Sequence, residues 1–304
     1  MVTPTFRPGT PDDTRAIYDV FVQSIGDFER RGGTSDGDNV WFDPGWVARF
    51  WERRGPLFDH LARTAEGCWI AERDGQVIGY ARATLHDGVR ELTEFFVLPG
   101  HQAGGVGCEL LARAFPHGGA RRRVIIATTD TPALARYLKA GVSPRFPIYS
   151  ISGKPHPADI PTDLTIERAT ATPETFAELR AIDQAILGFA RDTDHAFLLS
   201  DRRAELYRRG DQVVGYGYVG NGTGPIALLE VSDVPAVLAR AETEAARRHE
   251  ADFGLNVPLV NRAAVDHLLR RGFRLDGTFP MFFMSDEAFG AFEHYIVSSP
   301  PFFL

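Results

Sequence analysis

A short glycine-rich segment holds the residues whose types and spacing best suit chemistry. Gln102, Gly105 and Gly107 follow an apolar run that ends at Pro99, and a helical run begins after them at Cys108. Glycines let backbone N–H groups approach a phosphate closely, and a helix N-terminus adds unpaired N–H groups and the positive end of its dipole. The segment therefore predicts an anion site, with a plain turn between strand and helix as the alternative.

Two other phosphate motifs do not fit this segment. A P-loop of the GxxxxGK type is absent, and the two lysines of the chain, Lys139 and Lys154, lie elsewhere. A dinucleotide loop of the GxGxxG type would need glycine at position 110, where the chain has Leu110. The anion is therefore not expected to be the triphosphate or the dinucleotide that these loops bind.

The elements that must position this segment alternate between helix and strand. Helical apolar spacing recurs in four segments: 17–25, 46–58, 108–115 and 132–139. Strand patterns recur in five segments: 68–73, 76–84, 91–98, 124–129 and 146–152. Asp74-Gly75 is a hairpin turn signal, and Gly141 suits the end of a helix. The pattern predicts an α+β fold, a mixed central sheet flanked by helices.

The chain length and a proline-containing stretch indicate two domains. At 304 residues the chain is long enough for two domains of ordinary size. Residues 153–158 contain two prolines just after a glycine, which can continue neither a helix nor a central strand. We expect the domains to be 1–153 and 154–304, the second with a C-terminal extension.

The second half repeats features of the first. The stretch 74–80 is echoed by 210–216, and the stretch 136–142 is echoed by 267–273, in the same order along the chain. This order indicates a duplicated α/β unit rather than chance similarity.

Composition and charge exclude several classes of protein. No run of 18 apolar residues occurs, and the N-terminus lacks the pattern of a signal peptide, so we expect a cytoplasmic protein without membrane contact. The net charge of −7 argues against a nucleic-acid surface, which needs a basic face. All but two of the 33 cationic residues are Arg, which favours a GC-rich bacterial source.

Cysteine and histidine spacing predicts neither a disulfide framework nor a metal site. Cys68 and Cys108 lie far apart without a CxxC pair, and no HxH or HxxxH pair occurs. We therefore expect no metal.

Three elements together resemble the GNAT N-acetyltransferase superfamily. Its cofactor motif, Q/R-x-x-G-x-G/A after a strand ending in V-x-P, is matched by Val97-Leu98-Pro99, Gln102, Gly105 and Gly107. The hairpin 74–80 also matches, and 133–142 is similar to the family's A-x-x-x-Y-x-x-x-G-F element, with Val142 in place of Phe. The resemblance spans residues 1 to about 150, and together with the duplication it implies two tandem acyl-CoA N-acyltransferase-like domains.

The resemblance also implies the co-substrate and its site. Acetyl-CoA or another acyl-CoA would donate the acyl group. Its diphosphate would be held by backbone amides of the loop, and the tetrahedral oxyanion by a backbone N–H near Val97. The loop residues are Gln102, Ala103, Gly104, Gly105, Val106 and Gly107.

Two side chains match the positions of the family's acid and base. Tyr137, four residues before Gly141, would protonate the leaving thiolate, with aromatic packing as the alternative. Glu94 would accept the proton of the amine, and Glu91 or a water chain are alternative bases. A salt-bridged strand carboxylate is the plain interpretation of Glu94, and a strand bulge would change the face that it occupies.

The second half lacks the family's residues at the cofactor loop and at the position of the acid. Val231-Ser232-Asp233 stands where the cofactor loop is expected and a helix follows directly, while Leu268 stands at the tyrosine position. The second domain is therefore expected to be degenerate and to bind no CoA.

Acceptor recognition is expected from residues 28–60, where acids and aromatics gather. The residues are Glu29, Asp36, Asp38, Asp43, Trp41, Phe42, Trp46 and Trp51. They suit a cationic or aromatic amine, with a solvated acidic loop over a tryptophan core as the alternative. The apolar C-terminus, 298–304, is expected to pack on a domain or a partner.

These features predict an acetyl-CoA-dependent N-acetyltransferase acting on an amine of a small molecule or peptide. The alternative is a non-catalytic acyl-CoA-binding or sensor protein. The sequence leaves the acceptor and the oligomeric state open, with a homodimer as one candidate.

Overall fold

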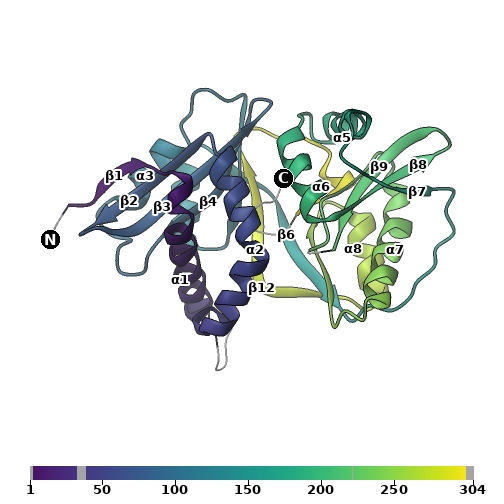
Figure 1. The fold of residues 1–304 in the computed structure, drawn as a ribbon, viewed down its shortest axis with the longest axis horizontal. Coiled ribbons are helices and arrows are strands. Elements are labelled where there is room, and N and C mark those ends of the chain that lie inside the picture. Colours follow the sequence, from purple (N-terminus) through teal and green to yellow (C-terminus); the bar gives the residue numbers. More distant parts are fainter. Residues whose placement is uncertain (1–2, 33–38, 221, 299–304) are drawn as a thin grey trace. The chain divides into compact units, whose positions relative to one another are not determined.

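The computed structural model describes residues 3–32, 39–220 and 222–298 (Figure 1). The chain divides between Ser143 and Pro144 into two units, and unit 1 also includes Ser285–Glu287 from near the C-terminus. This division differs from the domain boundary expected at 153/154 by the length of one strand. The two units are described separately below.

In the described part of unit 1, the strands follow the order β1-β2-β3-β4-β5. Their bounds are β1 Thr5–Pro8, β2 Gly67–Arg73, β3 Gln76–His86, β4 Val89–Val97 and β5 Arg122–Thr128. The helices are α1 Thr14–Gly32, α2 Pro44–Thr64, α3 Val106–Ala114 and α4 Thr131–Lys139. β2 and β3 form a hairpin whose turn residues, Asp74 and Gly75, both have positive φ, as the Asp-Gly pair predicts.

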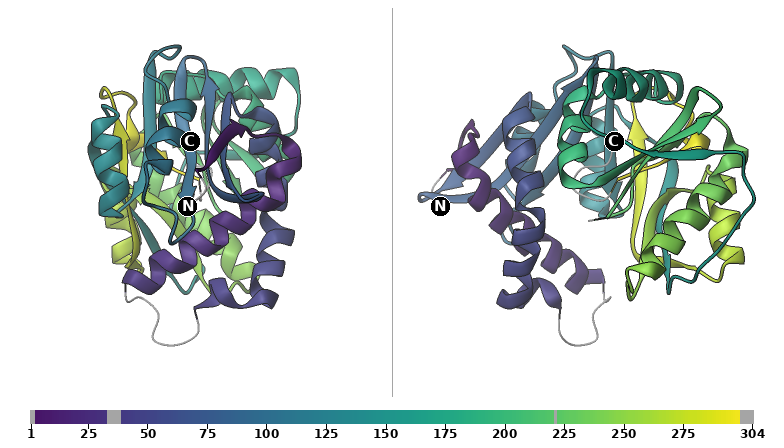
Figure 2. Two further views of the ribbon diagram at one scale, coloured as in Figure 1. Left: turned by 90° about the vertical axis from the view of Figure 1, so that its left-hand side faces the viewer. Right: turned by 45° about the vertical axis from the view of Figure 1, so that its right-hand side comes forward.

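Helices cover both faces of this sheet (Figures 1 and 2). On one face Phe21 of α1 packs edge-on against Phe96 of β4. On the other face Leu110 of α3 lies 3.2 Å from the Cβ position of Gly79 on β3. Because successive residues of a strand point to opposite faces, Phe95 lies on the α3 side.

The parallel pair β4 and β5 separates partway along its length. Residues pair from Val89 with Arg122 to Leu92 with Ile125, but β4 continues to Val97. The edge of β4 beyond Leu92 is therefore not paired with β5, and the place where the two strands separate is called the opening below.

Unit 2 holds two groups of strands. One has the order β13-β10-β9-β8-β7, and β6 lies between β12 and β11 in the other. The bounds are β6 Ser143–Gly153, β7 Thr165–Arg168, β8 Arg203–Arg209, β9 Gln212–Val219, β10 Ile226–Leu228, β11 Phe253–Pro258, β12 Arg274–Ser285 and β13 Tyr295–Ile296. The helices are α5 Pro173–Ile186, α6 Asp192–Asp201, α7 Val234–Arg247 and α8 Arg262–Arg270.

The echoed sequences have matching local structures, which supports the duplication. The hairpins β2–β3 and β8–β9 each carry one extra residue on the second strand, Ile78 in unit 1 and Val214 in unit 2. The predicted α+β fold with sheets flanked by helices is confirmed. The sheet that contains the parallel pair β4–β5 is mixed as expected, whereas the sheet β13-β10-β9-β8-β7 is antiparallel.

The ends of α4 and α8 also match. Each helix is followed by a glycine of positive φ, Gly141 or Gly272. The N–H of the next residue donates to Tyr137 O in one unit and to Leu268 O in the other. Tyr137 and Leu268 therefore occupy equivalent positions.

Candidate active site

The glycine loop ends in a helix whose N-terminus has no side-chain cap. Gly105 is the N-cap residue of α3, with φ of 82°, and Gly104 has φ of 78°. A Cβ atom at either glycine would meet nothing within 4 Å. The unpaired N–H groups of the first turn can therefore be reached by an anion, and these residues fit the diphosphate of an acyl-CoA.

Gly107 is favoured by close packing rather than by its backbone angle. A Cβ atom there would lie 3.1 Å from the Phe95 ring and 3.3 Å from Nε of Arg136. The first turn of α3 therefore approaches both β4 and α4 closely.

The edge of β4 that faces the opening carries the backbone groups of Val97. Leu98 N–H donates to Ile78 O on β3, at 2.8 Å. Because successive N–H groups of a strand point to opposite edges, the N–H of Val97 points toward the opening. The carbonyl of Val97 accepts a 3.4 Å bond from Nε2 of Gln102, which ties the start of the loop to the strand.

Tyr137 lies on the same face of the sheet as α3. It is 6% exposed, and its ring meets that of Phe95 edge-on, with centroids 6.1 Å apart. Burial raises the pKa of the Tyr137 hydroxyl above its ordinary value, the charge of Asp130 raises it further, and Arg136 opposes the shift. The phenol is therefore protonated at neutral pH and can act as a donor.

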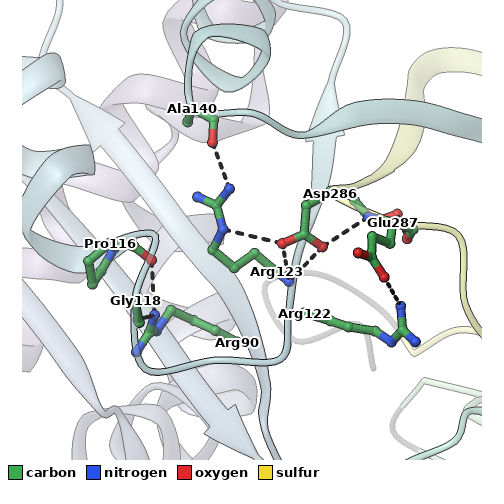
Figure 3. Close-up of polar contacts among 9 residues, drawn as sticks. Arg90, Pro116, Gly118, Arg122, Arg123, Ala140, Asp286 and Glu287 are labelled. Carbon is green, nitrogen blue, oxygen red and sulfur yellow. Dashed lines mark hydrogen bonds and ion pairs between the residues drawn. The ribbon is translucent and has the colours of Figure 1, made fainter.

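Arg123 at the start of β5 holds α4 in place (Figure 3). Its Nη2 donates to Ala140 O at the end of α4, at 2.9 Å, and its Nε donates to Asp286 at 3.4 Å. The backbone N–H of Arg123 also donates to the Asp286 carboxylate, at 3.0 and 3.1 Å. Figure 3 shows Arg122 paired with Glu287 beside it, at 2.9 Å.

Glu94, the predicted base, lies in a buried ion pair. Its carboxylate pairs with Arg82, and neither side chain is exposed. Oε1 accepts from Tyr80 OH at 2.9 Å, and Arg82 also donates to Phe58 O at 3.2 Å. Both carboxylate oxygens of Glu94 are already acceptors, which is the salt-bridged alternative stated above.

A bulge in β4 decides where the two glutamates point. Arg82 pairs with Glu94 and Ala83 with Leu92, which leaves Thr93 as the extra residue. Because Glu91 pairs with Thr84, Glu91 and Glu94 both point to the face of Arg82, although they are three residues apart. Both are buried, so an amine could reach neither without a rearrangement.

Most of the described acids and aromatics of residues 28–60 have partners within unit 1. Trp41 donates to Glu29 at 2.7 Å, and its ring meets Trp46 edge-on. Burial raises the pKa of Glu29, and the Trp41 bond opposes the rise. Asp43 caps α2, Trp51 packs on Tyr18, and Phe42 is 52% exposed. Asp36 and Asp38 lie outside the described residues.

Unit 2 has a different arrangement at each of the corresponding places. α7 begins after Asp233, which accepts a 2.8 Å bond from Arg209, and no glycine precedes the helix. Leu268 is buried at the place of Tyr137. The expected degeneracy of this half rests on these two residues, and its lack of CoA binding stays a prediction.

The C-terminal segment lies between the unit 2 counterparts of β4 and β5. Ile296 of β13 pairs with Ile226 of β10, and Val297 forms a bridge with Asn256 of β11. Ser298 is buried and accepts a 2.9 Å bond from Arg202. This segment fills the place that lies open in unit 1, and residues 299–304 of the predicted packing tail lie outside the described residues.

Within residues 3–32, 39–220 and 222–298, no group of three His, Cys, Asp or Glu residues could hold a metal ion. Both cysteines are free thiols. No helix in the same ranges is long and apolar enough to cross a membrane.

Sequence reasoning missed the arginines that support the site. Arg82 is a charge within a strand of buried residues, which is a usable signal for a buried ion pair. Arg123 carries no such signal, because its partner Asp286 comes from a distant part of the chain. Arg136 carries none either, because its approach to the first turn of α3 depends on how the two helices pack.

Comparison with known proteins agrees with this geometry. Residues 37–142, about a third of the chain, match the model of the acetyltransferase (GNAT) family. No curated protein matches the chain by sequence.

Several solved structures resemble the chain over nearly its whole length. A putative acetyltransferase from Pyrococcus horikoshii has a TM-score of 0.70 at 15% identity, covering 97% of this chain and 94% of that one. A tandem GNAT protein from the clavulanic acid biosynthesis pathway has a TM-score of 0.58 at 17% identity, covering 93% and 98%. A GCN5-related N-acetyltransferase from Sphaerobacter thermophilus has a TM-score of 0.56 at 14% identity, covering 93% and 95%. At these identities the likeness shows the fold, here a tandem GNAT fold.

Proposed function

Because residues 37–142 match the model of the GNAT acetyltransferase family and the fold is that of tandem GNAT proteins, we propose that the chain is a GNAT acetyltransferase whose unit 1 transfers an acetyl group from acetyl-CoA to an amine of a small molecule or peptide. One observation carries the proposal. The opening between β4 and β5 lies beside an uncapped helix N-terminus that a glycine loop exposes. Acetyl-CoA would supply the acetyl thioester, and residues 102–107 would hold its diphosphate through backbone amides.

The residues of the opening divide the chemistry between them. The amine nitrogen attacks the thioester carbonyl, and the N–H of Val97 stabilises the charge that develops on the carbonyl oxygen. The C–S bond then breaks, and Tyr137 donates its proton to the leaving sulfur. The amine loses a proton to a base, for which Glu94, Glu91 and a water chain remain the candidates.

The buried ion pair of Glu94 favours the water chain. A carboxylate that already accepts from Arg82 and Tyr80 must break one of these bonds before it can take a proton. Glu94 then acts as a positioning residue that holds β4 next to the bulge.

A substitution in the glycine loop tests the proposed function. Gly105→Glu introduces a side chain and a negative charge at the proposed diphosphate site, so acetyl-CoA binding measured by calorimetry should be lost. Gly75→Glu is a matched control, because Gly75 also has positive φ and open space around its Cβ position but lies in the β2–β3 turn. Equal binding by the two variants would reject the loop assignment.

A thiol-release assay separates the enzyme from the alternative of a non-catalytic acyl-CoA-binding protein. With acetyl-CoA and a broad panel of amines, an acetyltransferase releases CoA thiol in the presence of at least one amine. Binding without release for every amine would favour the sensor.

A further inference from the structure

Arg136 has no role in the mechanism above, although it lies beside both parts of the site. It precedes Tyr137 on α4, and its Nε and Cδ atoms lie 3.3 and 3.7 Å from the ideal Cβ position of Gly107. The side chain therefore reaches from α4 to the first turn of α3, where backbone N–H groups are unpaired.

The charge of Arg136 is not matched by a carboxylate within the part of the chain that the structure describes. Its Nη1 donates to Pro132 O on the same helix, at 2.9 Å, and its buried Nε has no hydrogen-bond partner there. Three other arginines of unit 1, Arg82, Arg90 and Arg123, each pair with a carboxylate. The stem of the side chain is held by packing at its buried Nε, whereas the Nη1 end of the guanidinium lies at the surface, so the charge can be reached by an anion bound at the first turn of α3.

We propose that Arg136 binds the diphosphate of acetyl-CoA from the α4 side, opposite the backbone amides of α3. The inference rests on the proposed function, because it needs an acyl-CoA at the loop. A guanidinium presents paired donors that match two phosphate oxygens. The diphosphate then lies between a helix N-terminus and a side-chain cation.

The same contact would couple binding of the co-substrate to placement of the acid. Arg136 and Tyr137 are neighbours on one short helix, so an Arg136–phosphate contact fixes α4 relative to α3. Tyr137 is thereby held near the thioester end of the bound molecule. Arg136 is in this respect a positioning residue as well as a ligand of the phosphates.

Comparing two ligands shows whether Arg136 contacts the phosphates or affects the shape of the opening in general. Acetyl-CoA carries the diphosphate, whereas acetyl-pantetheine has the same thioester arm without phosphates. Arg136→Leu should raise the Kd of acetyl-CoA by about 10- to 100-fold, the usual effect of a lost charged hydrogen bond. Its affinity for acetyl-pantetheine, measured by ligand-observed NMR, should stay unchanged.

Lys139→Leu is the matched control. It removes one positive charge from the exposed side of the same helix, where charge is screened by solvent, and should change the Kd of acetyl-CoA by no more than about twofold. Arg136→Lys keeps the charge but not the paired donors, so its Kd should lie between those of the wild type and Arg136→Leu. Arg136→Lys also serves as the test variant if Arg136→Leu does not fold.

Each outcome decides the proposal. A Kd for Arg136→Leu equal to that of Lys139→Leu overturns it, and so does an equal loss of affinity for both ligands. Failure of the proposed function is distinguishable, because the wild-type protein would then bind neither ligand and both proposals would fall together.

Discussion

In unit 1 the pairing of β4 with β5 ends at Leu92 and Ile125, whereas in unit 2 the segment β13 lies between β10 and β11. The same pair of strands thus borders an opening in one half and a filled space in the other. In both halves a helix follows the first of these strands, but glycine precedes it in unit 1 and Asp233 precedes it in unit 2.

The two halves share their backbone features and differ in their chemical groups. Matching bulges at Ile78 and Val214 and matching helix ends at Gly141 and Gly272 are shared. The tyrosine, the glycine loop and the opening are found in unit 1 alone among the described residues. A duplicated fold can therefore keep its local geometry without keeping the groups that a reaction needs.

Buried polar networks lie next to the second hairpin strand in both halves. In unit 1, Tyr80 and Arg82 hold Glu94. In unit 2, Tyr216 stands at the place of Tyr80, and its hydroxyl donates to Asp183.

Other groups complete the network of unit 2. Asp183 also accepts from Arg191 Nε at 2.9 Å and lies 2.9 Å from His195 Nε2. Tyr218 lies 2.7 Å from His195 Nδ1. The network joins α5, α6 and β9 and is fully buried, so its role in unit 2 is to fix packing.

The largest expected effect concerns the tyrosine that distinguishes the halves. Tyr137→Phe should leave acetyl-CoA affinity nearly unchanged and lower kcat by roughly 10²–10⁴, the range for general acid catalysis. Steady-state kinetics with an active amine, together with calorimetry, check this. An unchanged kcat would make Tyr137 a packing residue, as Leu268 is in unit 2.

The contribution of β13 to the stability of unit 2 can be tested by placing a charged side chain in it. Ile296 is 1% exposed, so Ile296→Asp places an unpaired carboxylate among apolar groups and should lower the free energy of unfolding by about 3–5 kcal/mol. Denaturant unfolding measures the loss. The matched control is Leu269→Asp, a similar change at an exposed position of α8, which should change stability little. Equal losses of unfolding free energy in the two variants would show that Ile296 contributes no more to stability than an exposed residue.

The network of unit 2 predicts a dependence of stability on pH. Burial opposes ionisation of Asp183, but Arg191 and His195 outweigh it and hold the pKa of the carboxyl well below its ordinary value. A lowered folded-state pKa stabilises the fold above the unfolded-state pKa of about 3.9, and that stability is lost as pH falls further, by at most roughly 1.4 kcal/mol per pH unit. Unfolding curves below pH 4 should show this slope, and Asp183→Asn should reduce it. An equal slope in the wild type and in Asp183→Asn would contradict the role of Asp183 in this pH dependence.

The smallest expected effect is no effect. Asp233→Ala removes the carboxylate in front of α7, yet β13 still fills the space beside it. The stoichiometry should therefore stay at one acetyl-CoA per chain, and its affinity should not change. Calorimetric titration that gives two molecules per chain would require a second site in unit 2.

Much of the fold could be predicted from local sequence. Helices expected over 108–115 and 132–139 are α3 Val106–Ala114 and α4 Thr131–Lys139, because glycines mark the start of one and the end of the other. The hairpin and the duplication were likewise predicted from short stretches, whose conformation depends on near neighbours.

Features that depend on distant partners could not be predicted. Register shifts such as that at Thr93 leave no mark in the alternation of residues. The sequence could therefore raise a bulge near Glu94 as a possibility, but it could not place the bulge or predict the common face of Glu91 and Glu94. The placement of β13 depends on two strands that lie far earlier in the chain. The roles of Glu94 and Tyr137 remain predictions, since they depend on where an amine and a thioester bind.

The contact of Arg123 with Asp286 has a consequence for the order in which the protein can fold during synthesis. Unit 1 begins before unit 2 in the chain, but Ser285–Glu287, which belong to it, are made after nearly all of unit 2. Until then the backbone N–H and guanidinium of Arg123 lack the carboxylate that they bind in the finished protein. Domains usually fold as units, N-terminal first, whereas here the half that starts first must wait for nearly the whole of the second before its last contacts form.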